Sequence, residues 1–97
     1  MKLKLTIDPD SRRVMIRGAV VPLTPKEFEL LYFLARHPGK AFSREHILTA
    51  VWGMDFQGDE RTVDTHIKQL RERLDGERVL IVTVWGHGYR LDPGVQP

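Results

Sequence analysis

The chain has 97 residues, of which 41% are hydrophobic and 29% charged, so it can build one packed core but is too short for a two-domain catalytic cleft. It contains no cysteine, which excludes disulfide bonds, thiolate metal sites and a cysteine nucleophile. The formal net charge is only +2, but residues 61–73 hold four basic and two acidic side chains, which indicates either a polyanion partner or a solvated helix face.

No segment of the sequence is suited to cross a membrane. The longest apolar run, residues 30–35, has six residues, whereas a spanning helix needs about 20. The N-terminus lacks the apolar core of a signal peptide. We therefore expect a soluble, cytoplasmic domain with no membrane partner.

Residues 1–23 are predicted to form a small antiparallel sheet. Apolar and polar side chains alternate over residues 3–7, and residues 8–11 are rich in turn formers. A second strand is predicted over residues 13–17 and a third over residues 20–23. Because Pro22 cannot donate a hydrogen bond to a neighbouring strand, the third strand should lie at an edge of the sheet.

Residues 24–76 are predicted to form three helices. The first begins with a capping box, in which Thr24 caps the helix, Pro25 takes the first helical position and Glu27 reaches back to the cap. It should end after His37, before a Pro-Gly pair. Four apolar side chains share one face of this helix: Phe28, Leu31, Leu34 and Ala35.

The second helix should begin at Ser43 and stop at Gly53, and residues 54–58 should form a loop. The third, over residues 59–75, has Asp59 as candidate cap. One narrow apolar stripe should face the core: Val63, Ile67, Leu70 and Leu74. At about 100° per residue, a polar and basic set lies opposite. This set comprises Arg61, Thr65, Lys68, Gln69 and Glu72.

Residues 77–92 are predicted to form a β-hairpin, since β-branched residues run up to position 84 and two glycines follow at Gly86 and Gly88. Residues 93–97 should be a frayed tail. One domain over residues 1–97, with a sheet, three helices and a terminal hairpin in this order, is typical of an α+β winged helix-turn-helix. The basic third helix of such a domain could lie in a DNA major groove.

Three blocks of the sequence, LTPKEFELLYFLARHPGKAFSREHILTAVWG, ERTVDTHIKQLRERL and IVTVWGHGYRL, closely resemble the DNA-binding output domain of OmpR/PhoB-type bacterial response regulators. The resemblance implies a four-stranded N-terminal sheet, a three-helix bundle, a C-terminal hairpin wing near the minor groove, and binding to tandem half-sites in promoter DNA. A receiver domain normally precedes this domain and is absent from the sequence. We favour a fragment of a longer regulator over a lone output domain.

The resemblance assigns residues to two kinds of DNA contact. Base-reading positions are matched by Thr65, Lys68 and Gln69, which also lie on the outer face that the periodicity selects. Phosphate-binding positions are matched by Arg44, Trp52, Arg61, His66, Arg71, Thr83 and Tyr89. Core packing is an equal alternative for Trp52 and Tyr89, and a plain surface role is the alternative for His66.

The sequence departs from common family members at two positions. Gln69 stands where arginine is frequent, which moves the expected base preference from guanine towards adenine. Trp85 replaces a wing arginine; it could stack on a sugar or pack under the hairpin, and we favour packing. His87 or Arg90 would then make the polar wing contact. The loop at residues 54–58 matches a segment that contacts RNA polymerase in activators, with a generic flexible loop as the equal alternative.

Catalysis is not expected. The four histidines are scattered without metal-ligand spacing, and no P-loop, nucleophile elbow or dinucleotide-binding motif is present. We therefore predict no enzyme activity, no metal and no cofactor. The main alternative to DNA binding is a winged-helix module that binds another protein, because a fold by itself does not decide function. The basic outer face of the third helix favours DNA.

Overall fold

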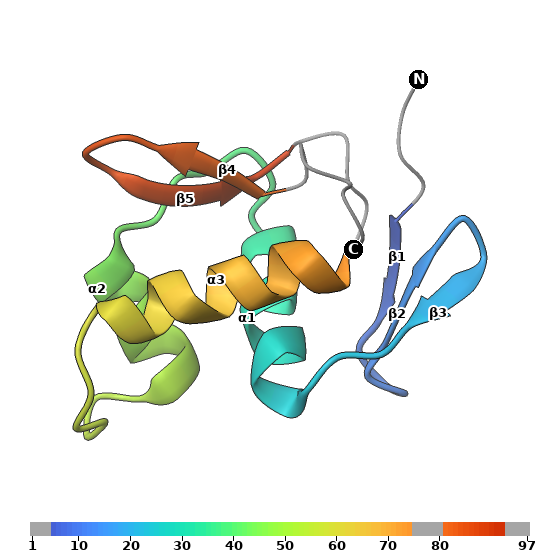
Figure 1. Ribbon diagram of the computed structural model, residues 1–97, viewed down its shortest axis with the longest axis horizontal. Coiled ribbons are helices and arrows are strands. Elements are labelled where there is room, and N and C mark those ends of the chain that lie inside the picture. Colours follow the sequence, from blue (N-terminus) through green and yellow to red (C-terminus); the bar gives the residue numbers. More distant parts are fainter. Residues whose placement is uncertain (1–4, 75–80, 93–97) are drawn as a thin grey trace.

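The computed structural model describes residues 5–74 and 81–92 (Figure 1). The elements follow the order β1 (Leu5–Asp8), β2 (Arg13–Ile16), β3 (Ala19–Val21), α1 (Pro25–Ala35), α2 (Arg44–Ile47), η1 (Leu48–Trp52), α3 (Arg61–Arg73), β4 (Ile81–Val84) and β5 (Gly88–Leu91). Some predictions concern residues outside these ranges. They are the predictions for residues 1–4, for the end of the third helix at residues 75–76, for residues 77–80 and for the tail at residues 93–97. No described helix is long and apolar enough to span a membrane.

The N-terminal sheet has three antiparallel strands in the order β1-β2-β3. Leu5, Ile7 and Val14 are buried on its inner face. The third strand ends at Val21 and not at residue 23, because Pro22 has no amide hydrogen for pairing, and β3 lies at an edge as predicted. The fourth strand implied by the family resemblance is not confirmed among the described residues, since the chain enters α1 directly after β3.

Helix α1 begins as the capping box predicts. The amide of Glu27 donates to Thr24 Oγ1 over 3.2 Å, and the amide of Thr24 donates to Glu27 Oε1 over 2.9 Å. The helix ends at Ala35, two residues before the predicted end. The proline at position 38 disfavours helical geometry at His37, and the amide of His37 bonds instead to the carbonyl of Leu34, three residues back.

Ser43 caps α2, as predicted, by accepting a hydrogen bond from the amide of His46 over 3.0 Å. The sequence did not predict the change to a π-helical turn, η1, after Ile47. Gly53 ends this segment with its amide shared between the carbonyls of Leu48 and Thr49, and with a left-handed φ of 100° that favours glycine. The predicted stop at Gly53 is therefore confirmed.

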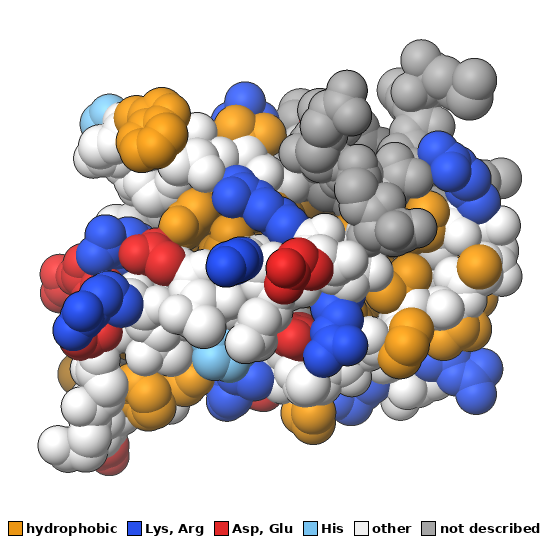
Figure 2. Space-filling model, viewed as in Figure 1, with side chains coloured by type: hydrophobic (Ala, Val, Ile, Leu, Met, Phe, Trp, Pro, Cys, Tyr) orange, Lys and Arg blue, Asp and Glu red, His pale blue; other side chains and the backbone are white. Residues whose placement is uncertain are grey.

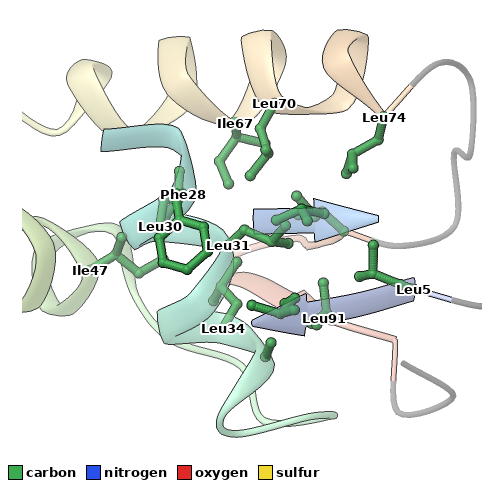
Figure 3. Packing of buried hydrophobic residues seen from close by; sticks show 14 of the residues in the cluster. Leu5, Phe28, Leu30, Leu31, Leu34, Ile47, Ile67, Leu70, Leu74 and Leu91 are labelled. Atoms are coloured by element: carbon green, nitrogen blue, oxygen red, sulfur yellow. The ribbon is translucent and has the colours of Figure 1, made fainter. Parts of the chain in front are cut away.

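Helix α3 begins at Arg61, not at Asp59, but the chemistry of the predicted cap is present because Asp59 Oδ1 accepts the amide of Arg61 over 2.9 Å. The predicted apolar stripe is buried, with all four side chains at most 1% exposed: Val63, Ile67, Leu70 and Leu74. Figure 3 shows Ile67 and Leu70 pointing from α3 into the core, where α1 contributes Leu30, Leu31 and Leu34.

Strands β4 and β5 form the predicted hairpin, with Ile81 opposite Leu91 and Val84 opposite Gly88. Backbone hydrogen bonds in both directions between Phe42 and Tyr89 attach the hairpin to the loop before α2. Gly88 is required at this contact, because a Cβ there would lie 1.9 Å from the carbonyl oxygen of Phe42. The hairpin therefore has a fixed position beside the helices (Figure 1).

The burial of α3 generates the first prediction. Leu70→Ala should lower the free energy of unfolding by about 2–5 kcal/mol, because it leaves a cavity under α3. Gln69→Ala, one residue away on the exposed side, should change it by less than about 0.5 kcal/mol. Urea denaturation followed by circular dichroism measures both. Equal midpoints for Leu70→Ala and the parent would show that the stripe does not face the core.

Candidate nucleic-acid interface

The outer face of α3 is exposed over its whole length. All five residues that the periodicity placed opposite the buried stripe are exposed: Arg61, Thr65, Lys68, Gln69 and Glu72. Figure 2 views this face and shows basic side chains spread along the band that α3 occupies, interspersed with acidic and uncharged ones. The predicted orientation of α3 is confirmed, so the sequence identified this face correctly.

Thr65, Lys68 and Gln69 have free polar groups. None of the three side chains forms a hydrogen bond or ion pair within the described part of the chain. Their spacing puts Lys68 and Gln69 one turn after Thr65 on the same face. Solvent therefore meets the methyl and hydroxyl of Thr65, the ammonium of Lys68 and the carboxamide of Gln69 side by side. These groups can contact the edges of bases.

Arg71, which the resemblance assigned to a phosphate, is engaged inside the molecule. Its guanidinium donates to the carbonyl oxygen of Ile81 over 2.8 Å and to Thr83 Oγ1 over 2.9 Å. It also lies over the ring of Tyr89, 5.7 Å from the centroid. Arg71 therefore connects α3 to β4, and it holds the hydroxyl of Thr83, another predicted phosphate ligand.

A second connection between α3 and the hairpin involves Asp64. Tyr89 donates its hydroxyl proton to Asp64 Oδ1 over 2.6 Å, while Arg44 lies 3.7 Å from Asp64 Oδ2 and 3.3 Å from Glu60. Burial, followed by the bond to Asp64, raises the pKa of Tyr89 to about 12. The predicted phosphate residues Arg44 and Tyr89 thus share one network at the N-terminal half of α3.

His66 and Trp52 contact each other beside the outer face. The rings meet edge to face with centroids 4.9 Å apart, and Trp52 also packs against the core, as its structural alternative predicted. His66 Nδ1 lies 2.8 Å from the carbonyl oxygen of Thr62, so in the neutral side chain this nitrogen carries the proton. Nε2 of the neutral ring is then an acceptor and can donate to a phosphate only when the ring is protonated, so phosphate binding by His66 stays a prediction.

Arg61 stands at the start of α3 with its side chain 85% exposed and its guanidinium 3.2 Å from Asp59. The bond from the Arg61 side chain, then the bond from its amide, lowers the pKa of Asp59. An exposed pair of this kind contributes little to stability, so the guanidinium can exchange Asp59 for a phosphate at small cost.

The hairpin tip contradicts one prediction. Trp85 is 87% exposed, so packing under the hairpin is wrong. Trp85 comes directly after Val84, the last residue of β4, so its exposed indole lies at the turn of the hairpin. His87 in the same turn is exposed, whereas Arg90 on β5 is half-buried.

The loop over residues 54–58 is exposed throughout. Met54 is 88% exposed, while Phe56 leans towards Trp52 with ring centroids 6.1 Å apart. These side chains form a partly apolar surface next to η1. Contact of this loop with RNA polymerase stays a prediction.

One buried charge was missed from the sequence. Glu27 is fully buried, and its Oε1 accepts the amide of Thr24 and lies 3.5 Å from Arg73 Nε. The capping-box pattern predicted the first bond but gave no signal for the second, because Arg73 comes from the far end of α3. This pair connects the start of α1 to the end of α3. No group of three or more metal-ligating side chains occurs within residues 5–74 and 81–92.

Comparison with known sequences places the chain in a family. Residues 18–91 match the family described as "Transcriptional regulatory protein, C terminal". The chain belongs to this family. The resemblance to OmpR/PhoB-type output domains is therefore confirmed, and the family is one of transcriptional regulators and not of enzymes.

Curated relatives of this output domain are longer proteins. The transcriptional regulatory protein ResD of Bacillus subtilis is 52% identical over 96 residues, which cover 95% of this chain and 40% of ResD. SrrA of Staphylococcus aureus is 51% identical over 94 residues, which cover 91% of this chain and 38% of SrrA. The output domain thus spans about two fifths of the length of the curated relatives it matches.

Solved output domains share the fold. The DNA-binding domain of RstA from Klebsiella pneumoniae, in complex with the RstA box, superposes with a TM-score of 0.83 at 36% identity, covering 96% of this chain and 95% of that one. The DNA-binding domain of the response regulator AdeR, in complex with an intercistronic region, gives 0.83 at 33% identity, covering 92% and 94%. The winged-helix fold is thereby confirmed.

The raised pKa of Tyr89 generates a prediction about alkaline stability. The ordinary phenol pKa is 10.0 and the folded value about 12, so the unfolded chain loses its proton first. The contribution of the protonated Tyr89 hydroxyl to the free energy of unfolding is therefore fully present below pH 10 and is lost as the pH rises towards about 12. In Tyr89→Phe, the free energy of unfolding should fall less over this range. Denaturant midpoints measured across it in both forms test this, and parallel profiles would contradict it.

Proposed function

We propose that this output domain binds double-stranded DNA sequence-specifically, with α3 in the major groove and the β4–β5 hairpin near the minor groove. The observation that carries the proposal is the exposed outer face of α3, where Thr65, Lys68 and Gln69 present free donors and acceptors. An α-helix fits the width of the major groove, and such side chains can reach base edges there. The DNA complexes of RstA and AdeR support the proposal by similarity.

The proposed contacts fall into two groups. Base readout rests on Thr65, Lys68 and Gln69, while phosphate contacts position the helix and carry no sequence information. Exposed Arg61 can exchange its ion pair with Asp59 for a phosphate, and Nε2 of His66 can donate to a phosphate when the ring is protonated. Four others, already bonded within the protein or packed on its core, would add a phosphate through remaining N–H or O–H donors: Arg44, Trp52, Arg71 and Thr83. Tyr89 would bind a phosphate only by giving up its hydroxyl bond to Asp64.

For the wing, we propose that Trp85 contacts the minor groove directly. An indole that is 87% exposed at a hairpin tip can lie against a sugar or wedge at a base step, as apolar side chains of minor-groove binders do. His87, exposed in the same turn, can add a polar contact, and Arg90 is the second candidate. Unlike an arginine, Trp85 would add no counterion release to the binding.

The wider setting follows from the family. We propose tandem half-sites in promoter DNA as the binding site, a cytoplasmic location, control by a phosphorylated receiver domain in the longer regulator, and contact of the loop at residues 54–58 with RNA polymerase. The length of the curated relatives, about two and a half times their match to this chain, leaves room in them for a further domain of this kind. Selection of bound DNA from a random duplex pool tests the central claim. A pool without enrichment would overturn sequence-specific binding.

A salt titration tests the role of Lys68. If Lys68 also neutralises a phosphate, beside its proposed base contact, Lys68→Ala should weaken binding to every duplex and reduce the slope of log K against log salt by about 0.9. Lys40→Ala is a matched control, because Lys40 is an exposed lysine in the loop between α1 and α2. An unchanged slope with altered preference at one base pair would instead assign Lys68 to base readout alone.

Gln69 should determine one base pair in each half-site. Its carboxamide offers a donor and an acceptor that match adenine, whereas the guanidinium of Gln69→Arg matches guanine. This substitution should move the preference from A·T to G·C by about 1–3 kcal/mol. Gln69→Ala should relax selectivity at that pair without changing the salt slope.

The measurement compares Kd values for single base-pair substitutions of the selected site at one salt concentration. Neighbouring positions serve as internal controls and should hardly change. The same profile for parent, alanine and arginine forms would show that Gln69 reaches no base. Readout would then rest on Thr65 or on DNA shape.

A further inference from the structure

The side of α1 that faces away from the core is unusually aromatic. The buried stripe of the helix consists of Glu27, Phe28, Leu30, Leu31, Leu34 and Ala35. The opposite stripe, at about 100° per residue, consists of Glu29, Tyr32, Phe33 and Arg36. Tyr32 and Phe33 are only half-buried there, although such a face is ordinarily polar. Because the core that includes Ile67 and Leu70 of α3 covers the buried stripe, the aromatic stripe is turned away from α3.

A hollow of about 230 Å³ lies along this stripe. We call it the Arg12–Arg36 groove. It is formed by the turn before β2, by α1 and by η1, and its lining includes Arg12, Glu29, Tyr32, Phe33, Arg36 and Val51. No residue of α3 or of the hairpin lines it. In Figure 1, α1 lies behind α3, which agrees with a groove on the side away from the proposed DNA surface.

Two guanidinium groups in the groove are held on aromatic rings. The Arg12 guanidinium lies 4.8 Å from the centroid of Phe28, and that of Arg36 lies 5.1 Å from the centroid of Tyr32. These rings stack on each other at 5.7 Å. Neither arginine forms an ion pair with a carboxylate in the described ranges. A guanidinium ordered on a ring keeps its in-plane N–H donors free, so binding a carboxylate costs little additional side-chain entropy.

The charge and shape of the groove favour a particular occupant. Glu29 is paired with Lys26 at 3.3 Å, so the two arginines leave the groove positively charged. The ring of Tyr32 stacks on Phe28 and lies under the guanidinium of Arg36, and the ring of Phe33 packs on Phe42 with centroids 4.7 Å apart. Both rings are therefore occupied by contacts within the protein. Nucleic-acid bases would need a free ring to stack on. A peptide segment with carboxylates on both sides of an apolar side chain would match the positive charge of the groove and its apolar lining.

We propose that the Arg12–Arg36 groove binds an acidic segment of another protein, with carboxylates on Arg12 and Arg36 and an aliphatic or aromatic side chain in the hollow between them. The groove lies on the side of α1 away from α3, so the partner can bind while α3 contacts DNA. This surface is separate from the loop at residues 54–58, which contributes no lining residue.

Phage selection from a random peptide library against the DNA-bound domain tests the proposal. Enriched peptides should carry two or more Asp or Glu residues around an apolar residue. Arg36→Glu and Arg12→Asn should each weaken a selected peptide about tenfold or more in a fluorescence polarisation titration. Asparagine tolerates the left-handed φ of 57° at position 12, and so removes the charge without straining the backbone.

Lys40→Glu is the matched control, because Lys40 also lies over a ring, 5.2 Å from the Phe42 centroid, but does not line the groove. It should leave peptide affinity within about twofold of the parent. DNA affinity and thermal melting of the Arg12 and Arg36 variants should match the parent, which separates this proposal from DNA binding. The proposal would be overturned if the enriched peptides had no acidic motif or if both arginine variants bound the peptide as tightly as the parent. It would also be overturned if Lys68→Glu, and not the arginine variants, lost peptide binding.

Discussion

Helix α3 must bury one narrow stripe of four apolar side chains, and the arrangement of the rest of the domain depends on that constraint. Val63, Ile67, Leu70 and Leu74 are at most 1% exposed. Turning the helix by one residue position, about 100°, would expose this stripe and bury charged groups without partners. The hydrophobic core therefore selects which residues of α3 face solvent, and the proposed reading face is a consequence of packing.

Polar contacts then fix the hairpin against α3. Tyr89 bonds to Asp64 near the start of the helix, and Arg71 bonds to Ile81 and Thr83 near its end. Two such contacts, with the Phe42–Tyr89 backbone bonds, hold the hairpin and α3 in one relative orientation. A reading helix and a wing in a fixed relation reach the major and minor grooves with little loss of conformational entropy on binding. Residues that resemble phosphate ligands thus also have a structural role.

The buried carboxylate of Glu27 joins the two ends of the helical layer. It accepts the backbone amide of Thr24, the cap residue of α1, and faces Arg73 at the end of α3. Its Oε2 has no hydrogen-bond partner among the described residues. Only the Glu27 side of this ion pair is buried, because the Arg73 side chain is 52% exposed. Removing Arg73 is costly, since it leaves the charge of Glu27 buried without a partner. Arg73 is therefore best understood as a structural residue, although it belongs to the basic stretch that first indicated a polyanion partner.

The basic stretch shows how position in the fold changes the meaning of a charge. Arg71 and Arg73 bond to β4 and to α1, while Lys68, on the same helix, has no partner among the described residues. A count of charged residues gives these three side chains the same weight. Only Lys68 among the three presents its charge to a ligand without giving up a contact within the protein.

The sequence by itself determined the caps at Thr24 and Ser43, the stop at Gly53, the facing of α3 and the hairpin turn. Each rests on residues within about four positions of one another, where spacing alone decides which groups meet. Only the tertiary structure decided the partners of Glu27, Arg71 and Tyr89, the exposure of Trp85, and the meeting of Arg12 with Arg36 around one groove. These features depend on how segments that are distant in the sequence pack together. A local sequence pattern does not give the distance between such segments in the folded chain.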